Sequence, residues 1–180
     1  TGPMYDAMSD ALDAAERDPG VRVALVHGAK DCFTAGNDLK DFLERPPHSE
    51  ASPAFRFIQR IATFPKPLVA AVSGVAVGIG TTMLLHCDLA LIAETARLRA
   101  PFVPLGVVPE AAGSILMPAL MGNQRSSYAL YTGEWIDARQ AVECGLALRA
   151  VAPERLLDET MDLARRIATM PVSSLVETKR

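Results

Sequence analysis

The chain has 180 residues, of which 49% are hydrophobic and 22% are charged, and its formal net charge is −3 at pH 7. This length fits one domain with a real hydrophobic core, and the composition is typical of globular proteins. A weakly acidic chain without a Lys/Arg cluster is not expected to bind nucleic acid, and no apolar run reaches the ~20 residues needed to cross a bilayer.

The cysteines and the two ends indicate the setting of the chain. Cys32, Cys87 and Cys144 are scattered and odd in number, which predicts reduced thiols and a cytoplasmic location. No Cys or His pair has metal-ligand spacing, so no metal is expected. The chain begins TGPMYDAMSD, without the basic segment of a signal peptide. Because it does not begin with Met and stops inside a helical pattern, we expect it to be part of a longer chain.

The first 64 residues predict strands that alternate with helices, judged from apolar periodicity and from turn residues. The expected elements are a helix over Met4–Arg17, a strand over Val21–His27, a loop over Gly28–Phe33, a turn opening a short helix over Thr34–Leu43, a mobile loop over Glu44–Pro53 and a helix over Phe55–Phe64.

A glycine-rich stretch follows, and it has two explanations. Leu68–Val72 predicts a buried strand, Gly78–Gly80 a turn, and Met83–Leu91 a buried helix that includes His86 as a packed residue. Such a turn directs backbone N–H groups at one point, which the helix dipole makes favourable for negative charge. The glycines would equally serve only to let a helix pack closely on a sheet.

The last 80 residues continue the alternation, which predicts βαβ units and an α/β fold. The expected elements are a short strand or turn over Ala96–Ala100, an irregular segment over Pro101–Pro109, helices over Ser114–Met121, Arg125–Thr132 and Asp137–Gly145, a strand over Leu148–Val151, a helix over Pro153–Met170 with Leu156, Leu157, Met161, Leu163, Ala164 and Ile167 facing inward, and a helix from Ser173.

Two segments share one design and together predict a site. Phe33–Leu39 and Val77–Thr81 each follow a strand and each enter a helix. If these turns lie side by side, two backbone N–H groups can point at one oxygen, which is an oxyanion hole for an enolate or a tetrahedral intermediate. We assign the two N–H groups to Asn37 and Ile79.

The chain resembles the enoyl-CoA hydratase/isomerase (crotonase) superfamily in three stretches: CFTAGNDLKDF, then PKPLVAAVSGVAVGIGTTMLLHCDLALIAETARLRAPFVPLGVVPEAAGS, then TGEWIDARQAVECGLALRAV. The resemblance runs from Met4 to Lys179. It implies an α/β fold in which ββα units form a spiral, here one domain over 1–180 that lacks the N-terminal strand region and the C-terminal helices of the full-length family. It also implies an acyl-CoA thioester substrate, a homotrimer or hexamer, and no separate cofactor, because coenzyme A enters as part of the substrate.

The resemblance further implies which residues contact the substrate. Asn37 and its neighbours would line the thioester and adenine region of CoA. Lys40 would reach a CoA phosphate as a point charge, although a solvated helix lysine explains the same residue equally well. The residues expected to bind the substrate are Ala35, Gly36, Asp38, Leu39, Lys40, Gly78, Phe102, Leu105 and Pro109.

The acid–base residue is expected to be Glu110. At the positions where enoyl-CoA hydratases carry two glutamates, this sequence has Thr82 and Phe102. Glu110 lies in a context that resembles the Δ3,Δ2-enoyl-CoA isomerases, which use one glutamate to move a proton from C2 to C4 of a 3-enoyl-CoA. Its apolar neighbours would raise the pKa of its carboxyl if it is buried. From the local sequence alone, an acid that stabilises a helix N-terminus is the simpler explanation.

We therefore expect an enoyl-CoA isomerase that uses Glu110, Asn37 and Ile79. The first alternative is an enoyl-CoA hydratase or another acyl-CoA lyase of the family that places its carboxylate differently. An alternative of another class is a catalytically silent acyl-CoA-binding or scaffolding protein.

Overall fold

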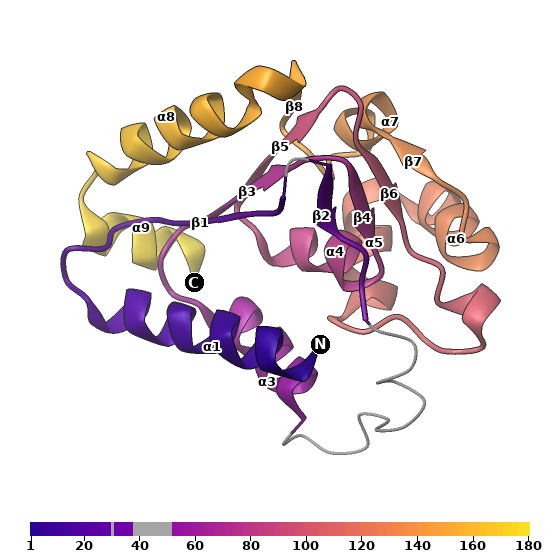
Figure 1. Ribbon diagram of the computed structural model, residues 1–180, viewed down its shortest axis with the longest axis horizontal. Coiled ribbons are helices and arrows are strands. Elements are labelled where there is room, and N and C mark those ends of the chain that lie inside the picture. The colour runs from indigo at the N-terminus through magenta and orange to yellow at the C-terminus, as the bar shows by residue number, and fades with distance from the viewer. Residues whose placement is uncertain (30, 38–51) are drawn as a thin grey trace.

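The strands of the protein are divided between two sheets. A computed structural model describes residues 1–29, 31–37 and 52–180. One four-stranded sheet has the order β1-β3-β5-β8 and the other has the order β2-β4-β6-β7 (Figure 1). The strands are β1 (Ala24–His27), β2 (Cys32–Thr34), β3 (Leu68–Val72), β4 (Val75–Val77), β5 (Leu89–Ala93), β6 (Arg97–Arg99), β7 (Ile136–Asp137) and β8 (Arg149–Val151).

Helices follow the strand pairs and cover the sheets. The helices and 3₁₀ turns described are α1 (Gly2–Arg17), α3 (Pro53–Thr63), α4 (Ile79–Thr82), η1 (Met83–His86), η2 (Val103–Leu105), α5 (Gly113–Met121), α6 (Asn123–Thr132), α7 (Ala138–Glu143), η3 (Pro153–Arg155), α8 (Leu156–Ala168) and α9 (Val172–Lys179).

The first six strands alternate between the two sheets, whereas β6 and β7 lie in the same sheet and pair antiparallel. The chain passes from β1 to β2, from β3 to β4 and from β5 to β6, and in each case the second strand lies in the other sheet. The β1–β3, β3–β5 and β5–β8 pairs are parallel, as are β2–β4 and β4–β6. Each pair of consecutive strands thus adds one strand to each sheet, and a helical segment then leads the chain back to the first sheet. This confirms the expected α/β spiral of ββα units.

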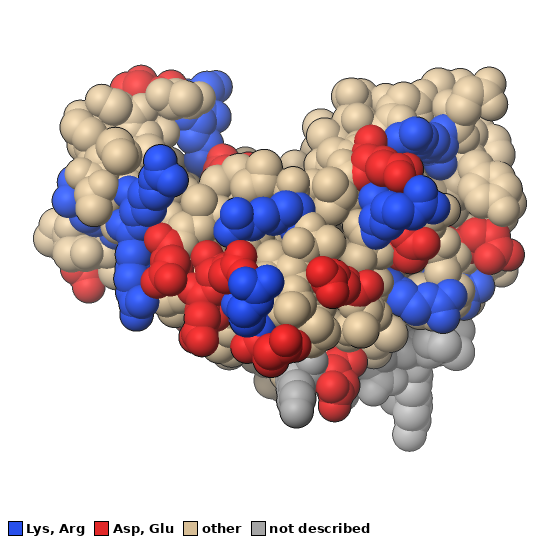
Figure 2. Space-filling model, turned by 90° about the horizontal axis from the view of Figure 1, so that it is seen from above, with Lys and Arg blue, Asp and Glu red and all other residues tan. Residues whose placement is uncertain are grey.

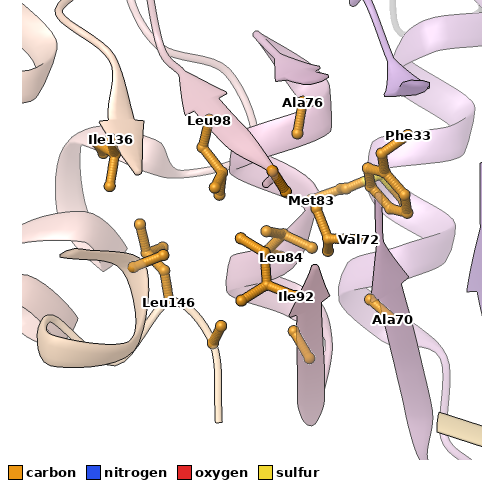
Figure 3. Packing of buried hydrophobic residues seen from close by; sticks show 14 of the residues in the cluster. Phe33, Ala70, Val72, Ala76, Met83, Leu84, Ile92, Leu98, Ile136 and Leu146 are labelled. Atoms are coloured by element: carbon orange, nitrogen blue, oxygen red, sulfur yellow. The ribbon is translucent and has the colours of Figure 1, made fainter. Parts of the chain in front are cut away.

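The core lies between the sheets and includes the short helical segment after β4. Figure 3 shows Met83 and Leu84 of η1 among Val72 and Ile92 of one sheet and Leu98 of the other. All five residues are at most 4% exposed. Strand β3 is buried at every position, as expected for a parallel strand that is covered on both faces.

Helices α1 and α3 lie side by side at the edge of the fold (Figure 1). Their outer faces are joined by ion pairs: Arg56 lies 2.6 Å from Asp10 and 3.0 Å from Asp13, and Arg60 lies 2.6 Å from both Asp13 and Glu16. Exposed pairs of this kind contribute at most about 1 kcal/mol each, but a network fixes the two helices relative to each other.

The charged side chains do not gather by sign on the face seen in Figure 2. Lysines and arginines lie beside aspartates and glutamates across this surface. In the part of the chain that the structure describes, no helix is long and apolar enough to span a membrane.

The prediction of a buried helix over Met83–Leu91 is wrong. Only Met83–His86 is helical, and Leu89 begins strand β5. The boundary is set by Asp88, whose carboxylate accepts a hydrogen bond from the backbone N–H of Leu68 at 2.7 Å. A continuous apolar run is buried in either structure, so periodicity could not separate helix from strand here.

Short strands were also missed, because a two- or three-residue strand carries little pattern. β2 (Cys32–Thr34) overlaps the predicted loop, and β4 and β7 were not predicted. On α8 the predicted inward positions Leu157 and Met161 are 43% and 36% exposed. By contrast, a helix does begin at the start of the predicted range Asp137–Gly145: Asp137 is the N-cap of α7, within a capping box with Gln140.

Candidate active site

The two glycine turns that the sequence singles out are neighbours. β2 ends at Thr34 and β4 ends at Val77, and these strands pair in parallel, with Cys32 opposite Val75. The carboxyl ends of parallel strands meet at the same edge of a sheet. The turns over residues 35–37 and 78–79 therefore leave the sheet together, as the oxyanion-hole hypothesis requires.

The close-packing explanation of the glycines holds at two positions, and the anion-site explanation stays a prediction. A Cβ atom on Gly36 would lie 2.8 Å from the carbonyl oxygen of Val77, and one on Gly80 would lie 2.6 Å from Cγ2 of Thr34, so these two glycines allow close packing of the turns. Of the residues that the structure describes, none lies within 4 Å of a Cβ on Gly78, and its φ of +58° favours glycine. We expect a ligand to approach the backbone on this side.

Ile79 is the first residue of α4, after the N-cap Gly78. The carbonyl of Gly78 accepts hydrogen bonds from the N–H groups of Thr81 and Thr82, at 2.9 and 3.0 Å. Among residues 1–29, 31–37 and 52–180, the N–H of Ile79 donates to no backbone acceptor. This N–H is thus available to an anionic ligand atom, at the positive end of the helical turn.

Glu110 contacts the last residue of α4. Its Oε1 accepts a hydrogen bond of 2.7 Å from the hydroxyl of Thr82, a residue that is fully buried. Burial raises the pKa of the Glu110 carboxyl, and this outweighs the opposite effects of the Thr82 hydroxyl and of the residue's own backbone N–H. The carboxyl is therefore a stronger base than an ordinary glutamate once it is ionised.

The backbone after Glu110 adopts an unusual conformation. Ala111 and Ala112 both have positive φ, +53° and +54°, although neither is glycine. The carbonyl of Ala111 lies 2.8 Å from Nε2 of His86, and the carbonyl of Glu110 accepts from the N–H of Gly113 at 2.9 Å. Left-handed conformations of non-glycine residues cost free energy and are concentrated at functional sites.

This geometry bears on the alternative explanation of Glu110 as a helix-terminal acid. α5 begins at Gly113, its N-cap is Ala112, and no side chain caps it. The Glu110 carboxyl is directed to Thr82 instead. His86, predicted as a packed residue of a buried helix, is half-buried and contacts the segment that carries Glu110.

A residue that the sequence analysis did not single out also lies at this site. Tyr5, on α1, is 8% exposed and its hydroxyl donates a hydrogen bond to Oδ1 of Asn37. Burial raises the pKa of Tyr5, and the negative charge of Glu110 raises it further. Tyr5 lies more than 30 positions before Asn37, so no local motif could have identified it.

The other predicted residues are spread around these groups. Phe102 is buried, Pro109 is half-buried, and Ala35 and Leu105 are exposed. Asp38, Leu39 and Lys40 lie outside the described residues. The contacts of all these residues with a substrate stay predictions.

A cleft of about 410 Å³ lies elsewhere, between α6 and α7, and Gln124, Trp135 and Cys144 are among the residues that line it. It includes none of Asn37, Ile79 and Glu110. We place the site by the convergence of backbone donors and a carboxylate, because size alone does not supply chemistry.

The chain is similar to several known proteins. A model of the family described as enoyl-CoA hydratase/isomerase matches residues 2–180. The chain is 35% identical over 179 residues to the 1,2-epoxyphenylacetyl-CoA isomerase of Escherichia coli (strain K12), which covers 96% of this chain and 68% of that protein. It is 34% identical over 168 residues to the crotonyl-CoA hydratase of Syntrophomonas wolfei, covering 89% of this chain and 63% of that protein.

Solved structures share the same architecture. The structure of Pseudomonas aeruginosa OdaA superposes with a TM-score of 0.97 at 45% identity, over 100% of this chain and 73% of that chain. The described fold and the matched structure therefore agree over the whole length of this chain.

Proposed function

This chain belongs to the enoyl-CoA hydratase/isomerase (crotonase) superfamily and has its α/β fold, and on that premise we propose that it isomerises 3-enoyl-CoA to trans-2-enoyl-CoA with Glu110 as the single acid–base. The observation that carries the proposal is the hydrogen bond between Thr82 and the Glu110 carboxyl. It places one carboxylate, with a raised pKa, beside the helical turn that begins at Ile79.

The proposed reaction needs one base and one anion site. The Glu110 carboxylate removes a proton from C2 of the 3-enoyl-CoA, and the electron pair moves into the thioester to form a dienolate. The backbone N–H groups of Asn37 and Ile79 stabilise the negative oxygen. Glu110 then returns the proton to C4, which moves the double bond to C2–C3 and restores the carboxylate.

Two residues favour isomerisation over hydration. Hydration by this family would use a pair of glutamates at the positions of Thr82 and Phe102, and both positions are buried and carry no carboxylate. Without that pair, the activation of a water molecule has no assigned base. No cofactor is required in the proposed reaction, since coenzyme A is part of the substrate.

Hydration, or another acyl-CoA lyase reaction, is the second candidate function. It is favoured by the name of one relative, a crotonyl-CoA hydratase that is 34% identical to this chain. In this reading Glu110 would activate water for addition to C3 of a 2-enoyl-CoA. A protein that binds acyl-CoA without turning it over is the candidate of another class.

Steady-state turnover of 3-enoyl-CoA and 2-enoyl-CoA by the wild type and by Glu110→Gln separates these candidates. The proposal expects isomerisation without hydration, and a loss of about 10²–10⁴-fold for Glu110→Gln. Hydration that survives Glu110→Gln would exclude it. Tight binding of acyl-CoA with no turnover of either substrate would favour the silent binding protein.

We also propose that the chain assembles as a homotrimer or a hexamer. Large apolar side chains are exposed around η2 and α5: Val103, Val108 and Ile115 are 46%, 84% and 71% exposed. Contiguous exposed apolar residues mark interaction surfaces. Analytical ultracentrifugation of the wild type and of Ile115→Glu tests this, because a monomeric wild type would contradict it. The three cysteines are free thiols, which fits the cytoplasmic location that we propose.

A further inference from the structure

Tyr5 joins the first helix to one of the two oxyanion turns. Its hydroxyl donates to Oδ1 of Asn37, 32 positions later in the chain. The side chain of Tyr5 is buried, whereas Asn37 is exposed. The bond therefore fixes an exposed turn residue to a group that is itself held by the protein core.

Two contacts of Tyr5 hold it in place, and ion pairs fix the helix that carries it. Its ring packs on Phe57 of α3, with 5.6 Å between ring centroids and 39° between ring planes. Its backbone carbonyl accepts a hydrogen bond of 2.9 Å from the hydroxyl of Ser9, which is fully buried. The ion pairs of Arg56 join α1 to α3 beside this contact. The hydroxyl of Tyr5 is thus a rigid donor, because its ring has little freedom to move.

The turn that carries Asn37 needs such a fixed point. Gly36 has a φ of +88°, and its N–H lies 3.2 Å from the hydroxyl oxygen of Thr34. This bond holds the turn from the strand side, and Val77 of the neighbouring strand packs against Gly36. One residue further along, the side chain of Asn37 accepts the hydrogen bond from Tyr5.

We propose that Tyr5 is a positioning residue for the oxyanion site: through its hydrogen bond to the Asn37 side chain, it orients the Asn37 backbone N–H toward the thioester oxygen. This inference depends on the proposed function of the two turns. It assigns a role to a side chain of α1, a helix that carries none of the residues in the proposed reaction. Electrostatic stabilisation of an oxyanion depends on donors held in advance, so a tethered turn is more effective than a free one.

Tyr5 acts as a donor and not as a base. Burial and the charge of Glu110 both raise the pKa of Tyr5 above that of a free phenol, so the hydroxyl is protonated at neutral pH. The Asn37 side-chain oxygen therefore accepts from a protonated hydroxyl under ordinary assay conditions.

The test compares Tyr5→Phe, Asn37→Ala and the double variant. Tyr5→Phe removes only the hydroxyl, and Asn37→Ala removes the tethered side chain but keeps the backbone N–H. We expect each single variant to lower kcat by about 10–100-fold, less than the 10²–10³-fold for loss of a whole oxyanion donor, with KM little changed. Because both changes break the same bond, the double variant should be no slower than the slower single variant.

Tyr131→Phe is the matched control, since Tyr131 is 68% exposed on α6 and takes no part in the proposed site. It should retain wild-type kcat. Additive losses in the double variant, or a wild-type kcat for Tyr5→Phe, would overturn the proposal. If Tyr5→Phe fails to fold, Asn37→Ala alone still tests the hydrogen bond, because Asn37 is its exposed partner.

A second readout does not depend on turnover. In difference infrared spectra, hydrogen bonds to the carbonyl of a bound ¹³C-labelled acyl-CoA thioester lower its stretching frequency. We expect a smaller shift in Tyr5→Phe and in Asn37→Ala than in the wild type. A wild type that shifts the carbonyl but does not isomerise would contradict the proposed function alone. Equal shifts in wild type and Tyr5→Phe, or no shift in any of them, would contradict the role of Tyr5.

Discussion

Thr82→Val removes the hydroxyl that contacts the proposed base and keeps the shape of the side chain. In the wild type, this hydroxyl donates to Oε1 of Glu110 at 2.7 Å from a fully buried position. A hydrogen bond to a carboxylate stabilises its ionised form, and so it lowers the pKa. Without the Thr82 hydroxyl, only the backbone N–H of Glu110 remains to oppose the rise in pKa that burial causes. We therefore expect the pKa of Glu110 to rise further in Thr82→Val.

The size of this effect follows from the geometry of the bond. A hydrogen bond to a charged group contributes about 1.5–3 kcal/mol, and 1.36 kcal/mol corresponds to one pKa unit, so the acidic limb of the pH–rate profile should move upward by about one to two pH units. The assay is kcat/KM for isomerisation of 3-enoyl-CoA against pH, since this parameter reports the free enzyme. A ¹³C NMR titration of the Glu110 carboxyl gives the same quantity without turnover.

Thr82→Ser is the matched control for this experiment. It keeps a hydroxyl on the same carbon, so its acidic limb should stay close to that of the wild type. An unchanged limb and an unchanged NMR titration in Thr82→Val would refute the view that this hydroxyl tunes the Glu110 carboxyl.

Three further predictions concern stability and the turns. Ala112→Gly relieves a φ of +54° and should raise the free energy of unfolding in urea by up to about 1 kcal/mol, whereas Ala11→Gly, at an exposed position inside α1, should lower it by about 1 kcal/mol. The pKa of Glu110 is raised in the folded state, so the wild type loses stability as the pH rises from about 4.5, the ordinary pKa of glutamate, through the raised pKa. Glu110→Gln has no carboxyl to ionise, so its melting temperature should rise relative to that of the wild type over this pH range. The same pH dependence in both proteins would contradict this. Gly36→Ala places a Cβ 2.8 Å from a carbonyl oxygen and should lower both stability and kcat more than Gly106→Ala, which has a φ of +72° in open space; equal effects would show that conformation alone matters.

The sequence predicted the parts of the fold that carry a local signal. Leu68–Val72 is a strand with the predicted bounds, because a run of Val and Ala between turn residues fits a buried parallel strand. The oxyanion-hole hypothesis required the two glycine turns to lie side by side, and β2 and β4 do pair in parallel. Met83–Leu91 failed because an apolar run that is buried throughout carries no period.

In the candidate site too, the features with a local sequence signal were predicted and the long-range contacts were not. The raised pKa of Glu110 was expected from its apolar neighbours, and burial does raise it. The contact of Thr82 with Glu110 and that of Tyr5 with Asn37 were not predicted. Each joins residues 28 or more positions apart, so only the packing of helices on the sheets brings them together. Sequence patterns describe which residues are neighbours along the chain, and they do not describe which distant residues are neighbours in space.

The central claim is that Glu110 alone moves the proton from C2 to C4 of a 3-enoyl-CoA. The most direct measurement is a single-turnover reaction in D₂O with the product analysed by ²H NMR, for the wild type and for Glu110→Gln. We predict that the wild type forms trans-2-enoyl-CoA in which C4 receives the proton removed from C2, with deuterium confined to C2 and C4 and present only as far as the Glu110 proton exchanges with solvent before its return. Glu110→Gln should lose both isomerisation and exchange by about 10²–10⁴-fold. Exchange or isomerisation at the wild-type rate in Glu110→Gln, or a hydrated product from the wild type, would contradict the claim.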